Sequence, residues 1–236
     1  MPLTRNKVLS GLSATDMDLI RPFLEPCEVE RGKILDGSNK CIEKVYFLES
    51  GIASVIALDA HGRHIEVGPF GREGMSGLPV VLRNDRSPFE TTVQASGTAY
   101  CIETPSLRLA IDQSPSLHSR LLSYVQAFSI QVGNTLLVNS YANINQRLAR
   151  WLLMAHDRTD GDNLPLTHEF ISMMLAVRRA GVTEAIQVLE GSRLIKATRG
   201  LVQVLDRKGL ESLAGDTYGP AEAEYDKLIT GKPSGD

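Results

Sequence analysis

The sequence predicts an α+β protein: an antiparallel, jelly-roll-like β-roll, one long dimerisation helix and a C-terminal winged helix-turn-helix. Three observations predict this order. Short β-rich runs bounded by Gly or Asp turns fill residues 28–103, and an apolar stripe of helical period follows from Ser114. Two short amphipathic helices and a hairpin then occupy residues 166–205. The expected divisions are 1–113 (sensor roll), 114–142 (long helix), 143–214 (DNA-binding domain) and 215–236 (polar tail).

The composition is that of a soluble globular protein. The chain has 236 residues, of which 42% are hydrophobic and 22% are charged, enough for one large or two modest domains. The first residues lack the apolar core of a signal peptide, and no apolar run looks long enough to cross a bilayer, which favours the cytoplasm. Because the net charge is −3, any nucleic-acid binding requires a local basic patch.

The roll is predicted from its turns. Runs at 44–49, 52–58 and 64–68 are separated by Ser50-Gly51 and by a polar turn at 59–63. Runs at 91–95 and 99–103 continue the pattern. Short strands at regular intervals favour an antiparallel barrel or roll.

The long helix is expected to begin at Ser114, a good N-cap, with Pro115 in the first helical turn. Its main apolar stripe consists of Leu117, Leu121, Val125, Phe128, Val132 and Leu136. A second apolar set, Leu122, Ile130 and Leu137, lies on another side of the helix. Since one small domain covers one face, two apolar faces favour pairing with a second copy of the helix. A long intramolecular core helix is the alternative.

The helix-turn-helix is predicted after a helix that begins near Asn143. Thr167 can cap a first short helix, and a second begins near Arg178 and Arg179. Two cations at a helix N-terminus are a modest liability in a free protein, but opposite DNA phosphates they become charge-assisted contacts. Gly181 is expected to leave room for a DNA backbone or base edge.

A hairpin at 194–205 completes the unit as a wing, and Asp206 can cap a short final helix. A surface arginine pair alone is usually only a solvated face. Here a winged helix-turn-helix bound to DNA would explain the basic residues of both the second helix and the wing, because both would face the duplex. The DNA-binding candidates are Thr167, His168, Arg178, Arg179, Thr183, Glu184, Gln187, Lys196 and Arg199.

The order of these units resembles the Crp/Fnr family of bacterial transcription regulators over residues 12–213. The pieces that carry the resemblance are ERGKIL at 30–35, VYFLESG at 45–51 and NQRLARWLL at 145–153. The resemblance implies a homodimer that binds a palindromic operator, with a cyclic-nucleotide-binding-like roll that senses a signal or contacts RNA polymerase. The family's base-reading Glu and Arg fall here on Ala180 and Glu184, so operator preference should differ.

Departures from the family pattern argue against cyclic AMP. The ribose-binding Gly-Glu pair falls in the segment 74–79, which has no glutamate. Arg86-Ser87 resembles the phosphate-binding pair but lies too far from 92–95, and matching backward puts Phe89 and Glu90 there. The adenine-facing Thr-Ser falls on Val132-Gly133. An effector pocket of altered chemistry stays open, with these candidates: Arg72, Glu73, Ser76, Arg86, Ser87, Thr91, Thr92, Tyr124 and Phe128.

No cofactor, metal site or enzymatic activity is predicted. Cys27, Cys41 and Cys101 form no CxxC pair, and His61 and His64 lie in a turn and its flank, so neither iron–sulfur nor haem ligation is supported. No catalytic triad or P-loop is present. The rival interpretation is a ligand-sensing roll that acts through protein partners, with a degenerate helix-turn-helix.

Overall fold

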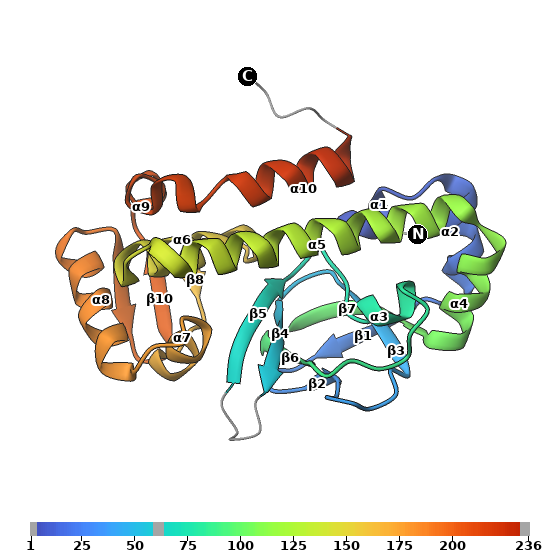
Figure 1. Ribbon diagram of the computed structural model, residues 1–236, viewed down its shortest axis with the longest axis horizontal. Helices are drawn as coiled ribbons and strands as arrows, with labels where there is room; N and C mark the ends of the chain where they lie inside the picture. The colour runs from blue at the N-terminus through green and yellow to red at the C-terminus, as the bar shows by residue number, and fades with distance from the viewer. Residues whose placement is uncertain (1–3, 59–63, 232–236) are drawn as a thin grey trace.

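The computed structural model describes residues 4–58 and 64–231. The predicted turn at 59–63, with His61, and the last residues of the tail lie outside the described residues. Helix α5 (Pro115–Tyr141) runs along the whole molecule, with the β-roll against its N-terminal part and the C-terminal domain at its other end (Figure 1). This arrangement confirms the predicted fold class.

The roll consists of two antiparallel sheets, with strand orders β1-β7-β3 and β2-β6-β4-β5. Its strands are β1 (Glu25–Val29), β2 (Ile34–Asp36), β3 (Lys44–Leu48), β4 (Ile52–Leu58), β5 (His64–Phe70), β6 (Glu90–Ala95) and β7 (Gly97–Glu103). Its short helices are α1 (Lys7–Ser10), α2 (Ala14–Ile20), η1 (Arg21–Phe23), α3 (Leu78–Val81) and α4 (Thr104–Gln113).

Helix α5 begins as predicted, because the Leu117 amide donates to the Ser114 hydroxyl at 3.2 Å. Its first half belongs to the core of its own roll. Leu117 and Leu121, predicted for a dimer face, are buried against roll residues such as Phe47, so they are unavailable to a partner. Leu136, on the second half, is 67% exposed. The apolar residues predicted for one face of the helix do share that face. The roll covers this face in the first turns of α5, so only the later turns can meet a partner.

By length and composition, α5 could cross a membrane, since its most apolar window has a mean hydropathy of 1.2. By this test, α5 is an exception to the expectation that no apolar run is long enough to cross a bilayer. Packing explains part of this apolar character, because Tyr124 and Phe128, together with the first turns, lie in the roll core, but only 28% of the most apolar window is buried.

The C-terminal domain has the order predicted for a winged helix-turn-helix. Its elements are α6 (Ile144–Arg158), β8 (Asn163–Leu164), α7 (His168–Met174), α8 (Arg179–Gly191), β9 (Ile195–Thr198), β10 (Leu201–Val204) and α9 (Arg207–Ala214). The wing is the β9–β10 hairpin, and β8 adds a third strand beside β10. Trp151 packs edge-on against Phe170 with ring centroids 5.4 Å apart, and Val182 and Leu189 of α8 close the same core.

A buried carboxyl joins the two domains. Glu66 of β5 accepts hydrogen bonds from the Ser54 hydroxyl at 2.6 Å and from the Trp151 indole N–H of α6 at 2.9 Å. Burial raises the pKa of Glu66 to about 7, against the opposing effect of these two hydrogen bonds. This residue therefore links the orientation of α6 to the roll.

The polar tail expected from residue 215 contains a packed helix. The turn η2 (Gly215–Thr217) leads into α10 (Pro220–Thr230), which lies along α5 on the side away from the roll's sheets (Figure 1). Ile229 is buried there, and the Arg120 guanidinium donates to its carbonyl. The Tyr225 hydroxyl donates to the Glu73 carbonyl at 2.6 Å, which ties the helix to the roll. Sequence reasoning missed this helix because its apolar residues are few.

Candidate DNA-binding surface and effector cavities

The turn between α7 and α8 is fixed from both sides. Thr167 caps α7, because its hydroxyl accepts from the Phe170 amide at 3.2 Å. Ala176 adopts a left-handed conformation with φ of 50°, which lets the chain turn sharply between the helices. The half-buried Arg147 of α6 donates to the Leu175 carbonyl. A side chain of α6 therefore helps to hold the turn that precedes α8.

The first turn of α8 presents two exposed guanidinium groups. Arg178 is the N-cap, and its side chain makes no capping hydrogen bond. Arg179 lies 2.6 Å from Glu169 in an ion pair whose side chains are both more than half exposed. Such exposed pairs contribute only about 0–1 kcal/mol, so a phosphate can replace the glutamate at little cost.

A groove of about 730 Å³ lies between α7, α8 and the wing. It brings together six of the nine predicted DNA-binding residues: Thr167, His168, Arg179, Thr183, Gln187 and Arg199. Arg178, Glu184 and Lys196 are exposed but do not line it. Helix, turn and wing thus form one continuous face.

Two groove residues escaped the sequence analysis. Glu169 pairs with Arg179, and Glu190 accepts a hydrogen bond from the Ala197 amide at 2.7 Å, which fixes the base of the wing. Only their acidic character in a basic segment could have signalled them. Together they reduce the positive charge of the groove in the free protein.

Gly181 lies where α8 packs against α6. A Cβ atom built there would come 3.3 Å from the Ile144 side chain of α6. The missing side chain therefore allows close packing of α8 on α6, and the expected clearance for DNA at this position stays a prediction.

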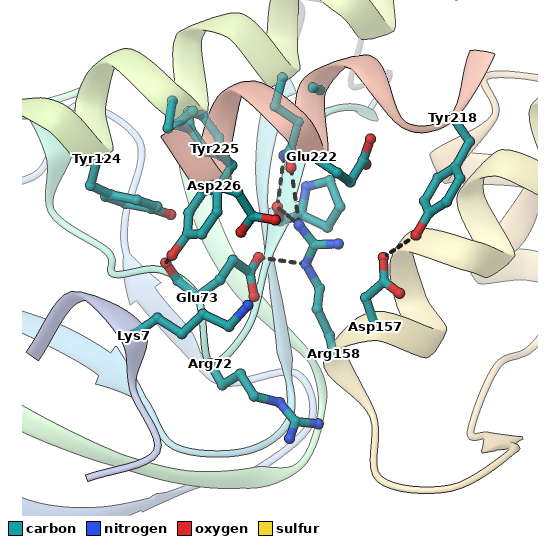
Figure 2. Close-up of a pocket in the computed structure, with 15 residues that line it drawn as sticks. Lys7, Arg72, Glu73, Tyr124, Asp157, Arg158, Tyr218, Glu222, Tyr225 and Asp226 are labelled. Carbon is teal, nitrogen blue, oxygen red and sulfur yellow. Dashed lines mark hydrogen bonds and ion pairs between the residues drawn. The ribbon is translucent and has the colours of Figure 1, made fainter. Parts of the chain in front are cut away.

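The predicted effector residues are divided between two cavities. One, of about 330 Å³, lies between the roll, α5, α6 and α10 (Figure 2). Arg158 crosses it and pairs with Glu73 at 2.6 Å, while Tyr218 donates to Asp157 at 2.8 Å. Arg72, Glu73, Tyr124 and Phe128 from the predicted set line it. Several charged residues line this cavity, and two of them, Arg158 and Glu73, form an ion pair with each other.

The second cavity, of about 350 Å³, lies between the roll and α5. Ser76, Ser87, Thr91 and Phe128 from the predicted set line it. Arg86 and Thr92 line neither cavity. The Arg86 guanidinium donates to the Asn39 carbonyl at 3.0 Å, and the Thr92 hydroxyl donates to Glu90 at 2.9 Å. The Arg86 guanidinium is therefore engaged outside both cavities.

A β-roll joined by a long helix to a winged helix-turn-helix, with two exposed arginines at the start of its second helix, defines a class: DNA-binding transcription regulators. Residues 146–213 match the Crp-like helix-turn-helix domain and belong to that family of domains. The chain as a whole has the fold of Crp/Fnr regulators.

Several solved structures share this fold. A transcriptional regulator of the Crp/Fnr family from Eubacterium rectale is 20% identical, with 86% of this chain and 95% of that chain covered and a TM-score of 0.68. FixK2 from Bradyrhizobium japonicum is 14% identical (81% and 98% covered, TM-score 0.68). The c-di-GMP-responsive regulator CLP from Xanthomonas campestris is 13% identical (81% and 99% covered, TM-score 0.65). A comparison with curated proteins found no match.

Proposed function

We propose that this protein is a cytoplasmic, non-enzymatic transcription regulator that binds a palindromic operator as a homodimer and does not respond to cyclic AMP. The observation that carries the proposal is the pair of exposed arginines at the start of α8, beside a groove bounded by the wing. A helix N-terminus in this setting can enter the major groove, where arginine contacts phosphates or guanine edges.

The second half of α5 supports the homodimer. Leu136, Leu137 and Tyr141 are exposed there, along a helix that carries the DNA-binding domain at its end, and Leu122 is exposed on the first half. A contiguous exposed apolar face on a soluble protein is typical of an interaction surface. Two copies paired along this face would present two α8 helices, which is the arrangement that a palindromic site requires.

Loss of cyclic AMP response is supported by the cavity between the roll and α5. No Lys, Arg or His is among the described residues that line it, so a bound phosphate would have no counter-charge. We also propose that the roll contacts RNA polymerase, and the support for this contact is the resemblance to the Crp/Fnr family.

The test is fluorescence anisotropy with duplex DNA from the protein's own upstream region, over a series of salt concentrations. The double variant Arg178→Ala/Arg179→Ala should bind about 10–100-fold more weakly and lower the salt slope by about 2, since each phosphate contact contributes about 0.9. Arg31→Ala/Lys40→Ala removes the same charge from exposed positions on the roll and is the matched control. Equal affinity of the two double variants would refute the choice of recognition residues.

A second candidate function follows from Glu169 and Glu190 in the groove. Their charges would favour a basic protein partner if the helix-turn-helix no longer binds DNA. Retention on heparin at low salt separates the two functions, because only the DNA-binding protein should be retained.

A further inference from the structure

Helix α8 has one buried face and two exposed faces. The buried face packs into the domain core and consists of Val182, Ala185, Ile186 and Leu189. One exposed face lines the groove between α7, α8 and the wing, and it consists of Arg179, Thr183, Gln187 and Glu190. The other, which we call the outer face, consists of Ala180, Glu184 and Val188, all exposed and all outside that groove. Because successive residues of an α-helix lie about 100° apart, the outer face points away from the domain core.

The middle of the outer face carries a carboxylate without a partner. No residue that the structure describes gives Glu184 a hydrogen bond or an ion pair. The two other carboxylates beside α8 are engaged. Glu169 pairs with Arg179 at 2.6 Å. Glu190 accepts a hydrogen bond from the Ala197 amide at 2.7 Å. Glu184 therefore keeps both of its carboxylate oxygens free to accept from a ligand.

A free carboxylate in this place restricts what the outer face can meet on DNA. Arg178 and Arg179 lie between one and two turns before Glu184, where they can hold the start of α8 on phosphates. A carboxylate so close to phosphates is repelled unless it meets a hydrogen-bond donor. At the edges of the base pairs in the major groove, the donors are the N4 amino group of cytosine and the N6 amino group of adenine. Glu184 therefore favours base pairs that present one of these amino groups to it.

Cytosine fits the carboxylate better than adenine does. Adenine presents the N7 acceptor beside its N6 amino group, so the second carboxylate oxygen would face a lone pair. Cytosine presents its N4 donor without an adjacent acceptor on the same base. The neighbours of Glu184 on the outer face are Ala180 and Val188, and Val188 is 50% exposed. Neither side chain carries a donor, so neither competes with a base for the carboxylate.

We propose that Glu184 determines operator specificity by accepting a hydrogen bond from the N4 amino group of a cytosine in each half-site. The inference rests on the proposed function, because it names the base that the same helix reads. Arg178 and Arg179 hold the helix on the phosphates, which every sequence offers, and Glu184 selects the base pair.

The experiment starts with selection of operators from a random duplex library by the full chain. Fluorescence anisotropy then measures duplexes in which each base pair of the half-site is changed in turn. One position should prefer cytosine by about tenfold over the other bases. Glu184→Gln should move the preference at that position to adenine, because an amide can pair with both N6 and N7. Glu184→Ala should bind all four bases there alike and keep the preferences at the other positions.

The matched control is Glu169→Gln, which removes the same charge from an exposed carboxylate beside the same helix. It frees Arg179 for phosphate, so it should tighten binding to every duplex by a similar factor and leave the base preferences unchanged. If Glu184→Gln behaves in the same way, or if the preference for cytosine survives in Glu184→Ala, the inference is overturned while the proposed function stands. If the unmodified protein binds no duplex at low salt, the proposed function fails and the inference fails with it.

Discussion

The buried glutamate between the domains gives the sharpest quantitative prediction. Glu66 is held by Ser54 and by Trp151, and burial raises its pKa from 4.5 to about 7. A proton therefore binds Glu66 more tightly in the folded chain than in the unfolded one. The free energy of unfolding should fall as pH rises from 4.5 to about 7 and should level off above that range.

The size of the effect follows from the shift. The difference between 7 and 4.5 is 2.5 pKa units, and one unit corresponds to about 1.4 kcal/mol, so Glu66 should reduce stability by about 3 kcal/mol across this range. Glu66→Gln keeps an acceptor for the indole but does not ionise. At pH 8 this variant should be more stable than the unmodified protein by up to about 3 kcal/mol, and at pH 4.5 the two should be similar.

The assay uses the chain's single tryptophan. Because Trp151 donates directly to Glu66, its intrinsic fluorescence should titrate with a midpoint near pH 7, and Glu66→Gln should abolish that transition. Urea unfolding at several pH values gives the stability slope. Glu28→Gln, at an exposed glutamate of β1, is the matched control and should leave both curves unchanged. A slope of opposite sign, or one that Glu66→Gln retains, would refute the reasoning.

Three other changes test the architecture. Ala176→Gly, at φ of 50°, should raise the free energy of unfolding by about 1 kcal/mol, and a lower value by urea unfolding would contradict the left-handed turn. Leu136→Glu, on the exposed half of α5, should give monomers in sedimentation velocity and weaken operator binding, whereas an unchanged dimer would place the interface elsewhere. A chain truncated after residue 218 loses the Tyr225–Glu73 hydrogen bond and the buried Ile229, so its melting temperature should fall. A chain truncated after Gly231 keeps α10 and is the control. Equal melting temperatures of the two truncated chains would mean that α10 does not stabilise the fold.

The fold was largely predictable because each element carries a local signal. Ser114 and Thr167 each cap the helix that they were expected to cap, and the wing forms at the predicted hairpin. These features depend on side chains and turns within a few residues of one another, so they survive without knowledge of the rest of the chain.

The site was predictable only in part. The sequence placed Arg179 and Arg199 on one surface but gave no sign that Glu169 and Glu190 border the same groove. It also grouped Arg86 with the effector residues, although that side chain points to the Asn39 carbonyl. Whether a charged side chain enters a cavity depends on the backbone geometry of residues several positions away. The hydrophobic periodicity of the sequence carries no information about that geometry.

The sequence by itself determined the order of the roll, long helix and winged helix-turn-helix, because capping, period and turn chemistry are local. Only the tertiary structure decided which face of α5 is covered, since Leu117 and Leu136 share one stripe but just the first meets the roll. It also decided that Asp36 and Glu66 are buried carboxyls, one beside an open cavity and one against an indole. Burial and long-range contacts come from the packing of distant segments, and no local pattern records them.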